Sequence, residues 1–501
     1  MQKVQTGCEV YSEKLSGGIP GNIGLVLVPN VVWGTLSSSS HYCQLGYHKL
    51  AIGADSGGNG VAGSMMLKLA ILFIIVGFVA KLNCDPARYD GYKLLRVHTR
   101  HRRDLEAVKR IHDAADERLD FWREPRSVHG DVDIMVSAEH QDYLSDLLQD
   151  GGLEAKTIIE DIQEAFEEQS AINTEEEKEF FGSYQNLSQI NEWMFTLGAD
   201  YPDIVTVYEI ATSYEGRPIH CLKVSDPYQA AESTKPAIFI MGGIHSREWL
   251  SPATVMFITN ELVENYGIDS EIKELLEGLD WYIVPVFNVD GYVFSWEKYR
   301  FWRKTRSEYD HNRCKGADPN RNWDFEWGVS GVSDMSCDDT YAGPFAFSET
   351  EVRQIADYLT DLNARQPING FIDFHAYSQL WMTPYGYDTV LPDNYQEQYN
   401  LAKDATDALR KVNGTDYTVG NIADVIYKAS GNSVDWARGK LRVPYTYAVE
   451  LPDKGRYGFL MPPRYIIPTG EETMEAIRVI GQGVMAYKGS ASKLDAGLPT
   501  A

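Results

Sequence analysis

The chain has 501 residues, of which 44% are hydrophobic, enough to fill at least one large core. Its formal net charge is −26, with a sequence pI near 4.8. A surface this acidic repels phosphate backbones and anionic lipid headgroups, so neither nucleic-acid binding nor stable membrane association is expected. We expect a monomer made of one large domain with smaller appendages.

The N-terminal region predicts a leader rather than a folded domain. Residues 1–64 are rich in glycine and serine and follow neither a helical nor a strand period. Residues 65–84 contain twelve consecutive apolar or glycine residues, 69–80, between two lysines. As a helix this run rises about 18 Å, too little to cross a hydrocarbon core of about 30 Å. It fits a secretory signal peptide if translation begins at Met65 or Met66. A buried core helix is the alternative, but no amphipathic segments flank the run.

Residues 85–178 predict a small α/β domain. Strand-like runs at 92–100 and 131–140 alternate with helix-like runs at 102–115 and 141–152. The acidic stretch 167–179 then predicts a linker, because its hydrophobicity is low.

Residues 179–490 predict a large α/β domain with a mixed, mostly buried sheet. Its strands are expected in the apolar runs at 236–245, 279–292, 368–377 and 445–452. Its helices are expected at 253–266, 348–364, 394–412 and 471–487. Near-continuous apolar strands are typical of a sheet that helices cover on both faces. Residues 491–501 are expected to be a tail.

The cysteines favour an oxidising compartment. Cys314 and Cys337 lie 23 residues apart across a stretch rich in Gly, Asp and Ser, which makes them a candidate loop-closing disulfide. Cys221 is expected to be a buried free thiol. The other three cysteines precede residue 85, in the part that processing would remove.

Candidate metal ligands lie where predicted strands end. His245 and Glu248 are three positions apart in "GGIHSREW", and His375 follows the apolar run of "GFIDFHAYSQL". Strand ends are where α/β sheets place their sites, and such residues are ordinary ligands of a catalytic zinc. Taken alone, a histidine at a strand end is more often a satisfied core residue than a ligand, and a bare H-x-x-E is a weak signal. Two signals at equivalent positions predict one zinc site.

Other polar residues would complete a hydrolytic site. Glu450, at the end of "YTYAVELPD", can serve as a general base or pair with a nearby arginine. Arg303, among the aromatics of "YRFWRKTRS", can hold an oxyanion or remain a surface charge. Asn320 and Arg321 in "DPNRNWD" offer a fork for a carboxylate, or form a turn. Tyr427 precedes a Ser- and Gly-containing stretch that would let its ring move. Together these residues describe an enzyme acting at a free C-terminus.

From about residue 180 to 490 the chain resembles the zinc metallocarboxypeptidases of the carboxypeptidase A and B family, and residues 85–178 resemble that family's activation segment. The motifs above, with "IYKASGNSVDW" and "VELPDKGRYGF", occur in the family's order. The resemblance implies one zinc ion per chain and these roles: zinc ligands His245, Glu248 and His375; catalytic base Glu450; oxyanion holder Arg303; terminal-carboxylate clamp Asn320, Arg321 and Tyr427; secondary groove contact Arg300.

Val434 matches the base of the family's specificity pocket. The resemblance implies that an apolar residue there accompanies A-type preference for aliphatic and aromatic C-terminal residues, whereas an acid accompanies B-type preference for Lys and Arg. An apolar floor cannot offset the desolvation of a buried cation, so we predict A-type specificity. Ala448 stands where A-type pockets carry threonine. Basic or mixed specificity is the alternative.

The resemblance also implies a secreted proenzyme that acts on the C-termini of peptides or proteins. A protease would activate it by cutting near Lys178, where four neighbouring glutamates disfavour trypsin-like enzymes. An acidic extracellular proenzyme would suit a digestive lumen.

Two other readings compete with this one. A metal-dependent deacylase shares the H-x-x-E start, but it does not require the complete set of arginines, asparagine and tyrosine. A peptide-binding relative without catalysis would have lost a ligand or the base, and none is lost.

Overall fold

The computed structural model describes residues 85–114, 118–170, 179–226, 235–309 and 313–487. The predicted leader, signal peptide and C-terminal tail lie outside these residues, as does Lys178. Among the described helices, none is both long and apolar enough to cross a membrane.

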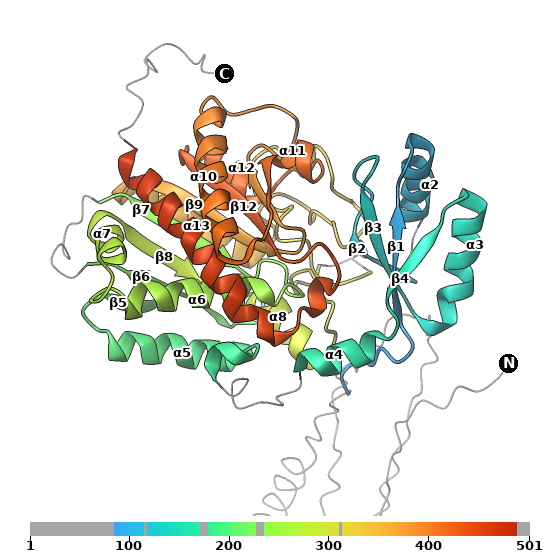
Figure 1. Ribbon diagram of the computed structural model, residues 1–501, viewed down its shortest axis with the longest axis horizontal. Helices are drawn as coiled ribbons and strands as arrows, with labels where there is room; N and C mark the ends of the chain where they lie inside the picture. Colours follow the sequence, from blue (N-terminus) through green and yellow to red (C-terminus); the bar gives the residue numbers. More distant parts are fainter. Residues whose placement is uncertain (1–84, 115–117, 171–178, 227–234, 310–312, 488–501) are drawn as a thin grey trace, which may run out of the picture. The chain divides into compact units, whose positions relative to one another are not determined.

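The smaller domain is a four-stranded antiparallel sheet with helices packed on it (Figure 1). Its strand order is β2-β3-β1-β4. Apolar residues of α2, α3 and the strands share one buried cluster, which explains the alternation of short strands and helices in the sequence. Its elements are β1 (Lys93–His98), α2 (Arg102–Asp113), β2 (Leu119–Arg123), β3 (Asp131–Val136), α3 (Gln141–Gly151), β4 (Ala155–Ile159) and α4 (Ile162–Ser170).

The larger domain is built on an eight-stranded sheet of order β11-β10-β12-β9-β7-β8-β6-β5. The four central strands, β12, β9, β7 and β8, run parallel, whereas β5 and β6 pair antiparallel at one edge. The strands are β5 (Val205–Thr212), β6 (Pro218–Val224), β7 (Ala237–Gly242), β8 (Asp280–Val284), β9 (Ile368–Ala376), β10 (Leu380–Thr383), β11 (Thr418–Asn421) and β12 (Tyr445–Leu451).

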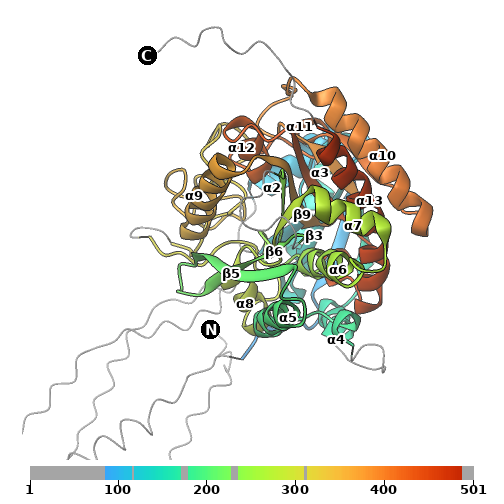
Figure 2. The same ribbon diagram turned by 90° about the vertical axis from the view of Figure 1, so that its left-hand side faces the viewer.

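Helices cover both faces of the larger sheet. Figure 2 shows α9 and α12 on one side and α6, α7, α10 and α13 on the other. The helices are α5 (Leu187–Asp200), α6 (Leu250–Glu264), α7 (Ser270–Gly278), α8 (Val289–Glu297), α9 (Thr350–Arg365), α10 (Tyr395–Asn413), α11 (Ile422–Val425), α12 (Ser433–Gly439) and α13 (Ile466–Ala486). Every residue of β7 and β8 is buried, as the apolar runs predict. The predicted fold class is confirmed.

Several predicted boundaries are wrong: α13 begins at Ile466 rather than 471, β3 ends at Val136 rather than 140, and two further cases have a clear physical reason. The strand predicted at 279–292 ends at Val284, and α8 begins at Val289. Pro285 follows the strand and lacks an N–H for the ladder, while the side chain of Asn288 caps the helix. The linker predicted from residue 167 begins later, because α4 continues to Ser170 and Gln169 is buried.

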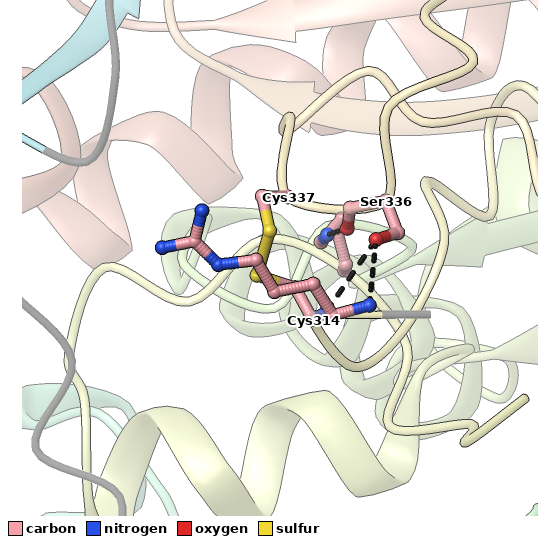
Figure 3. Close-up of a disulfide and its surroundings, with 5 residues drawn as sticks. Cys314, Ser336 and Cys337 are labelled. Atoms are coloured by element: carbon pink, nitrogen blue, oxygen red, sulfur yellow. Dashed lines mark hydrogen bonds between the residues drawn. A yellow bond between two sulfur atoms is a disulfide. The ribbon is translucent and has the colours of Figure 1, made fainter. Parts of the chain in front are cut away.

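The predicted disulfide between Cys314 and Cys337 is confirmed, with a Cα–Cα distance of 4.9 Å (Figure 3). Beside it, Ser336 Oγ accepts a hydrogen bond from the backbone N–H of Cys314 at 3.4 Å. Cys221 is buried and free, also as predicted. The disulfide closes a loop that contains Asn320 and Arg321, so it restrains the part of the chain that carries the candidate clamp.

Removing the disulfide with Cys314→Ser and Cys337→Ser is expected to lower the free energy of unfolding by about 3 kcal/mol, because the unfolded chain regains the entropy of the open loop. Thermal unfolding with and without a reductant measures this effect. The reductant should lower the melting temperature of the unmodified protein and leave the double variant unchanged. An equal response of the two proteins would contradict the role assigned to this bond.

Candidate active site

Three buried side chains converge at the carboxyl ends of two neighbouring parallel strands. His245 and Glu248 lie in the turn between β7 and α6, and His375 lies near the end of β9. Nδ1 of His245 is 2.8 Å from Oε1 of Glu248, and Nδ1 of His375 is 3.2 Å from Oε2 of Glu248. One ligand atom from each residue can be chosen so that all three lie within 4.8 Å of one another. This set of two imidazoles and one carboxylate fits a zinc site with three protein ligands.

An aspartate orients each of the two histidines. Nε2 of His245 is 3.1 Å from Oδ1 of Asp318, and Nε2 of His375 is 3.1 Å from Oδ2 of Asp373. A carboxylate can only accept, so each Nε2–H donates and each Nδ1 is left for a metal. Burial opposes the ionisation of Glu248, but the charges and hydrogen bonds of the two histidines outweigh it and lower the pKa of Glu248. The third candidate ligand is therefore held as a carboxylate.

Glu450 lies beside these ligands because β12 and β9 are parallel and pair Glu450 directly with His375. Burial in the first place and the charge of Glu248 in the second raise the pKa of Glu450 to about 7. A carboxyl group with this pKa can take up a proton near neutral pH, as a general base must. A zinc ion nearby would shift this pKa down, since its charge favours the carboxylate.

Arg303 extends toward the ligand cluster from the irregular segment after α8. It is buried, and Asp318 Oδ2 accepts hydrogen bonds from its Nε at 3.1 Å and its Nη2 at 2.7 Å. Its Nη1 lies 3.9 Å from Oε1 of Glu248. Asp318 thus fixes the guanidinium next to the candidate zinc ligands, where negative charge would develop on a substrate carbonyl.

Asn320, Arg321 and Tyr427 gather on one side of this cluster. Nδ2 of Asn320 is 3.3 Å from Nε2 of His375, and the guanidinium carbon of Arg321 is 5.5 Å from the centre of the Tyr427 ring. Arg321 is buried, and two of its nitrogens donate to backbone oxygens. Its Nη2 has no hydrogen-bond partner within the described parts of the chain. A buried cationic donor left over in this way suits a ligand carboxylate.

Val434 is buried on α12, which packs against β9 and β12. The preceding residue, Ser433, donates its backbone N–H to Oδ1 of Asn320 at 2.9 Å. The predicted pocket floor therefore follows directly on a residue bonded to the candidate clamp.

Arg300 does not lie open to solvent. It is buried over the Trp249 ring, 3.7 Å from the ring centre, and donates to Gln169 of the smaller domain at 3.0 Å. Arg247 pairs with Asp120 of the same domain at 3.2 Å. Two arginines of the larger domain are thus engaged by the smaller domain.

Arg126, between β2 and β3 of the smaller domain, reaches the predicted site itself. Its guanidinium carbon lies 5.1 Å from the centre of the Tyr427 ring. Burial lowers the pKa of Arg126, and attraction to Tyr427 and Glu450 opposes this effect. Its Nε has no hydrogen-bond partner among the residues that the structure describes.

The structure brings together the zinc-ligand, base and clamp residues that the sequence predicted. The sequence did not predict the residues that contact and orient them, which are Asp318, Asp373 and Arg126. Asp318 begins the quoted motif "DPNRNWD", and Asp373 precedes His375 by two residues. The period of a strand places residues two apart on one face, a signal that pointed to Asp373. Nothing in the sequence pointed to Arg126, because its partner is about 300 residues away.

Comparisons with known proteins identify the family of the chain. The family model for zinc carboxypeptidase matches residues 190–476, and the model for the carboxypeptidase activation peptide matches residues 95–169. Carboxypeptidase B of Astacus astacus is 46% identical over 60% of this chain and 97% of its own length, and carboxypeptidase A2 of Mus musculus is 37% identical over 82% and 98%. The crystal structure of thrombin activatable fibrinolysis inhibitor superposes with a TM-score of 0.72 at 31% identity, over 78% of this chain and 98% of that one. The chain therefore belongs to the zinc carboxypeptidase family and carries that family's activation peptide.

Proposed function

We propose that this protein is a secreted zinc-dependent exopeptidase that removes single residues from the C-termini of peptides and proteins. The observation that carries this proposal is the convergence of His245, Glu248 and His375 beside Glu450. Family membership supports zinc as the metal. The unpartnered Nη2 of Arg321 supports a terminal carboxylate as the group recognised.

Each residue has a separate task in this mechanism. His245, Glu248 and His375 would hold the zinc, which when bound supplies a Lewis acid and a lowered pKa for water. Glu450 takes the proton from the attacking water and passes it to the leaving amine. Arg303, fixed by Asp318, stabilises the oxyanion that forms from the scissile carbonyl. Asn320, Arg321 and Tyr427 bind the terminal carboxylate, so that only the last peptide bond reaches Glu450. Arg300 would contact the chain further along the groove after the activation peptide has left.

Val434 supports removal of aliphatic and aromatic C-terminal residues. It is 1% exposed and belongs to the main hydrophobic core of the larger domain. An apolar side chain buried against it contributes the free energy of leaving water, about 25 cal/mol per Å² of apolar surface.

The test is hydrolysis of blocked dipeptides ending in Phe, Leu or Glu, after cleavage of the chain between residues 170 and 182 and removal of the activation peptide. Release of Phe and Leu, abolished by a zinc chelator and restored by zinc, is the expected result. Release of Glu should be far slower, because its carboxylate would be desolvated against Val434. Folded, zinc-loaded protein that releases nothing would instead favour a peptide-binding relative without catalysis.

Substitutions separate the base from the ligands. Glu450→Gln should lower kcat by a factor of about 10² to 10⁴ and leave the zinc content at one per chain, because only proton transfer is lost. His375→Ala should lower both activity and zinc content. His220→Ala, at a half-buried histidine outside the site, is the control. Metal analysis of each purified variant distinguishes the two effects, and loss of zinc from Glu450→Gln would contradict the division of roles.

The contact of Arg126 with Tyr427 supports a proenzyme whose activation peptide blocks the clamp. Arg126→Ala in the uncut chain should raise hydrolysis of small dipeptides about tenfold, since one cation–π contact of about 1 kcal/mol or more is lost. Arg118→Ala is a matched control, because Arg118 stacks on Tyr143 within the activation peptide, 3.8 Å from the ring centre. Equal basal activity in both variants would show that Arg126 does not hold the site closed.

A further inference from the structure

The buried carboxylate of Asp373, on β9, has no role in the proposed mechanism beyond its hydrogen bond with His375. Asp373 is 0% exposed. Its Oδ2 accepts hydrogen bonds from Ser433 Oγ at 2.5 Å and from His375 Nε2 at 3.1 Å. Its Oδ1 has no hydrogen-bond partner in any described part of the chain. A buried carboxylate oxygen without a partner is unfavourable, so a donor from outside the described residues would stabilise this atom.

The register of the sheet places Asp373 two residues before His375 on β9, on the same face as the candidate zinc ligand. Parallel pairing of β9 with β12 sets Asp373 opposite Ala448, just as it sets His375 opposite Glu450. Residues two apart share a face, so these four side chains lie on the same side of the sheet. Two residues of a strand rise about 6.6 Å, which is comparable with the length of an extended lysine or arginine side chain.

Helix α12 lies over the same pair of strands. Its first residue, Ser433, donates its hydroxyl to Asp373 and its backbone N–H to Asn320. Val434, the predicted pocket floor, comes next. Asp373 is therefore linked through one residue to the clamp and to the floor of the pocket.

Another buried acid on α12 differs in this respect. The carboxylate of Asp435 accepts hydrogen bonds from the backbone N–H groups of Gly386 at 2.8 Å and Tyr387 at 2.9 Å, so both of its oxygens have donors. Asp435 supports the loop after β10. Asp373, by contrast, has one oxygen without a donor among the described residues.

We propose that Asp373 is a specificity-determining residue whose Oδ1 accepts a hydrogen bond from the ammonium or guanidinium group of a C-terminal lysine or arginine. The inference rests on the proposed carboxypeptidase function. Val434 alone predicts rejection of such side chains, because a desolvated cation there would have no counter-charge. Asp373 supplies that charge beside the apolar floor. The enzyme then removes basic as well as aliphatic and aromatic C-terminal residues.

The first test needs no substitution. The zinc-loaded protein is cleaved between residues 170 and 182 and separated from its activation peptide. It is then assayed on two blocked dipeptides, one ending in arginine and one in citrulline, which has the same shape without the charge. We expect kcat/KM for arginine to exceed that for citrulline by at least about tenfold, because only arginine brings a cation to Asp373. Equal values, or a preference for citrulline, would overturn the proposal.

The second test removes the charge of Asp373. Asp373→Asn should lower the ratio of kcat/KM for arginine-ended over leucine-ended substrate at least about tenfold. The ratio cancels any loss that acts through His375 on both substrates. Glu351→Gln on α9 is the matched control, because Oε2 of Glu351 is also buried and also lacks a partner within the described residues. The control should leave the ratio unchanged.

The remaining outcomes separate this proposal from the proposed function. An equal loss on both substrates, with faster release of zinc to a chelator, would mean that Asp373 only positions His375, and this would overturn its role in specificity. Hydrolysis of leucine-ended substrate with an unchanged ratio would overturn the specificity role and leave the carboxypeptidase function standing. Folded, zinc-loaded protein that hydrolyses no substrate would overturn both.

Discussion

The parallel pairing of β9 with β12 is the constraint on which the site depends. It sets His375 beside Glu450, a candidate ligand beside the candidate base, without any loop having to be ordered first. Parallel pairing of β7 with β9 then brings the turn that carries His245 and Glu248 to the same edge. Reactive groups from three segments of the chain are thus positioned by the central strands of the sheet, which are largely buried and more rigid than a surface loop.

Charge pairing with Asp318, inside the larger domain, positions the site residues that the sheet does not carry. Asp318 is hydrogen-bonded at once to His245, Arg303 and the backbone of Asn320, so one buried carboxylate links a candidate zinc ligand, the proposed oxyanion arginine and the candidate clamp. Burial opposes its ionisation, but Arg303 in the first place and His245 in the second keep the pKa of Asp318 well below its usual range. Such a network is favourable only because every charge in it has a partner.

The activation peptide contacts the catalytic domain at Tyr427, Arg247 and Arg300, and the first and last of these are proposed to bind substrate. Arg126 faces Tyr427, Asp120 pairs with Arg247, and Gln169 accepts from Arg300. These contacts come from three separate parts of the peptide: the loop between β2 and β3, β2 itself and α4. Because the contacts are spread over the folded domain, cutting the chain near Lys178 does not by itself remove them. Release of the peptide also requires that these contacts dissociate.

The sequence by itself determined the fold class, the disulfide and the candidate ligand, base and clamp residues. Apolar runs, turn residues and the order of the motifs can be recognised in the sequence without a structure. It did not determine where the strand after residue 279 ends, or that α4 continues to Ser170, because packing decides such boundaries. Only the tertiary structure brought Asp318, Asp373 and Arg126 to the site. Asp318 and Arg126 act through burial and through partners that are not their sequence neighbours, such as Arg303 and Tyr427. The strand period placed Asp373 on the same face as His375, but its bond to Ser433 is a contact 60 residues away that only the fold reveals.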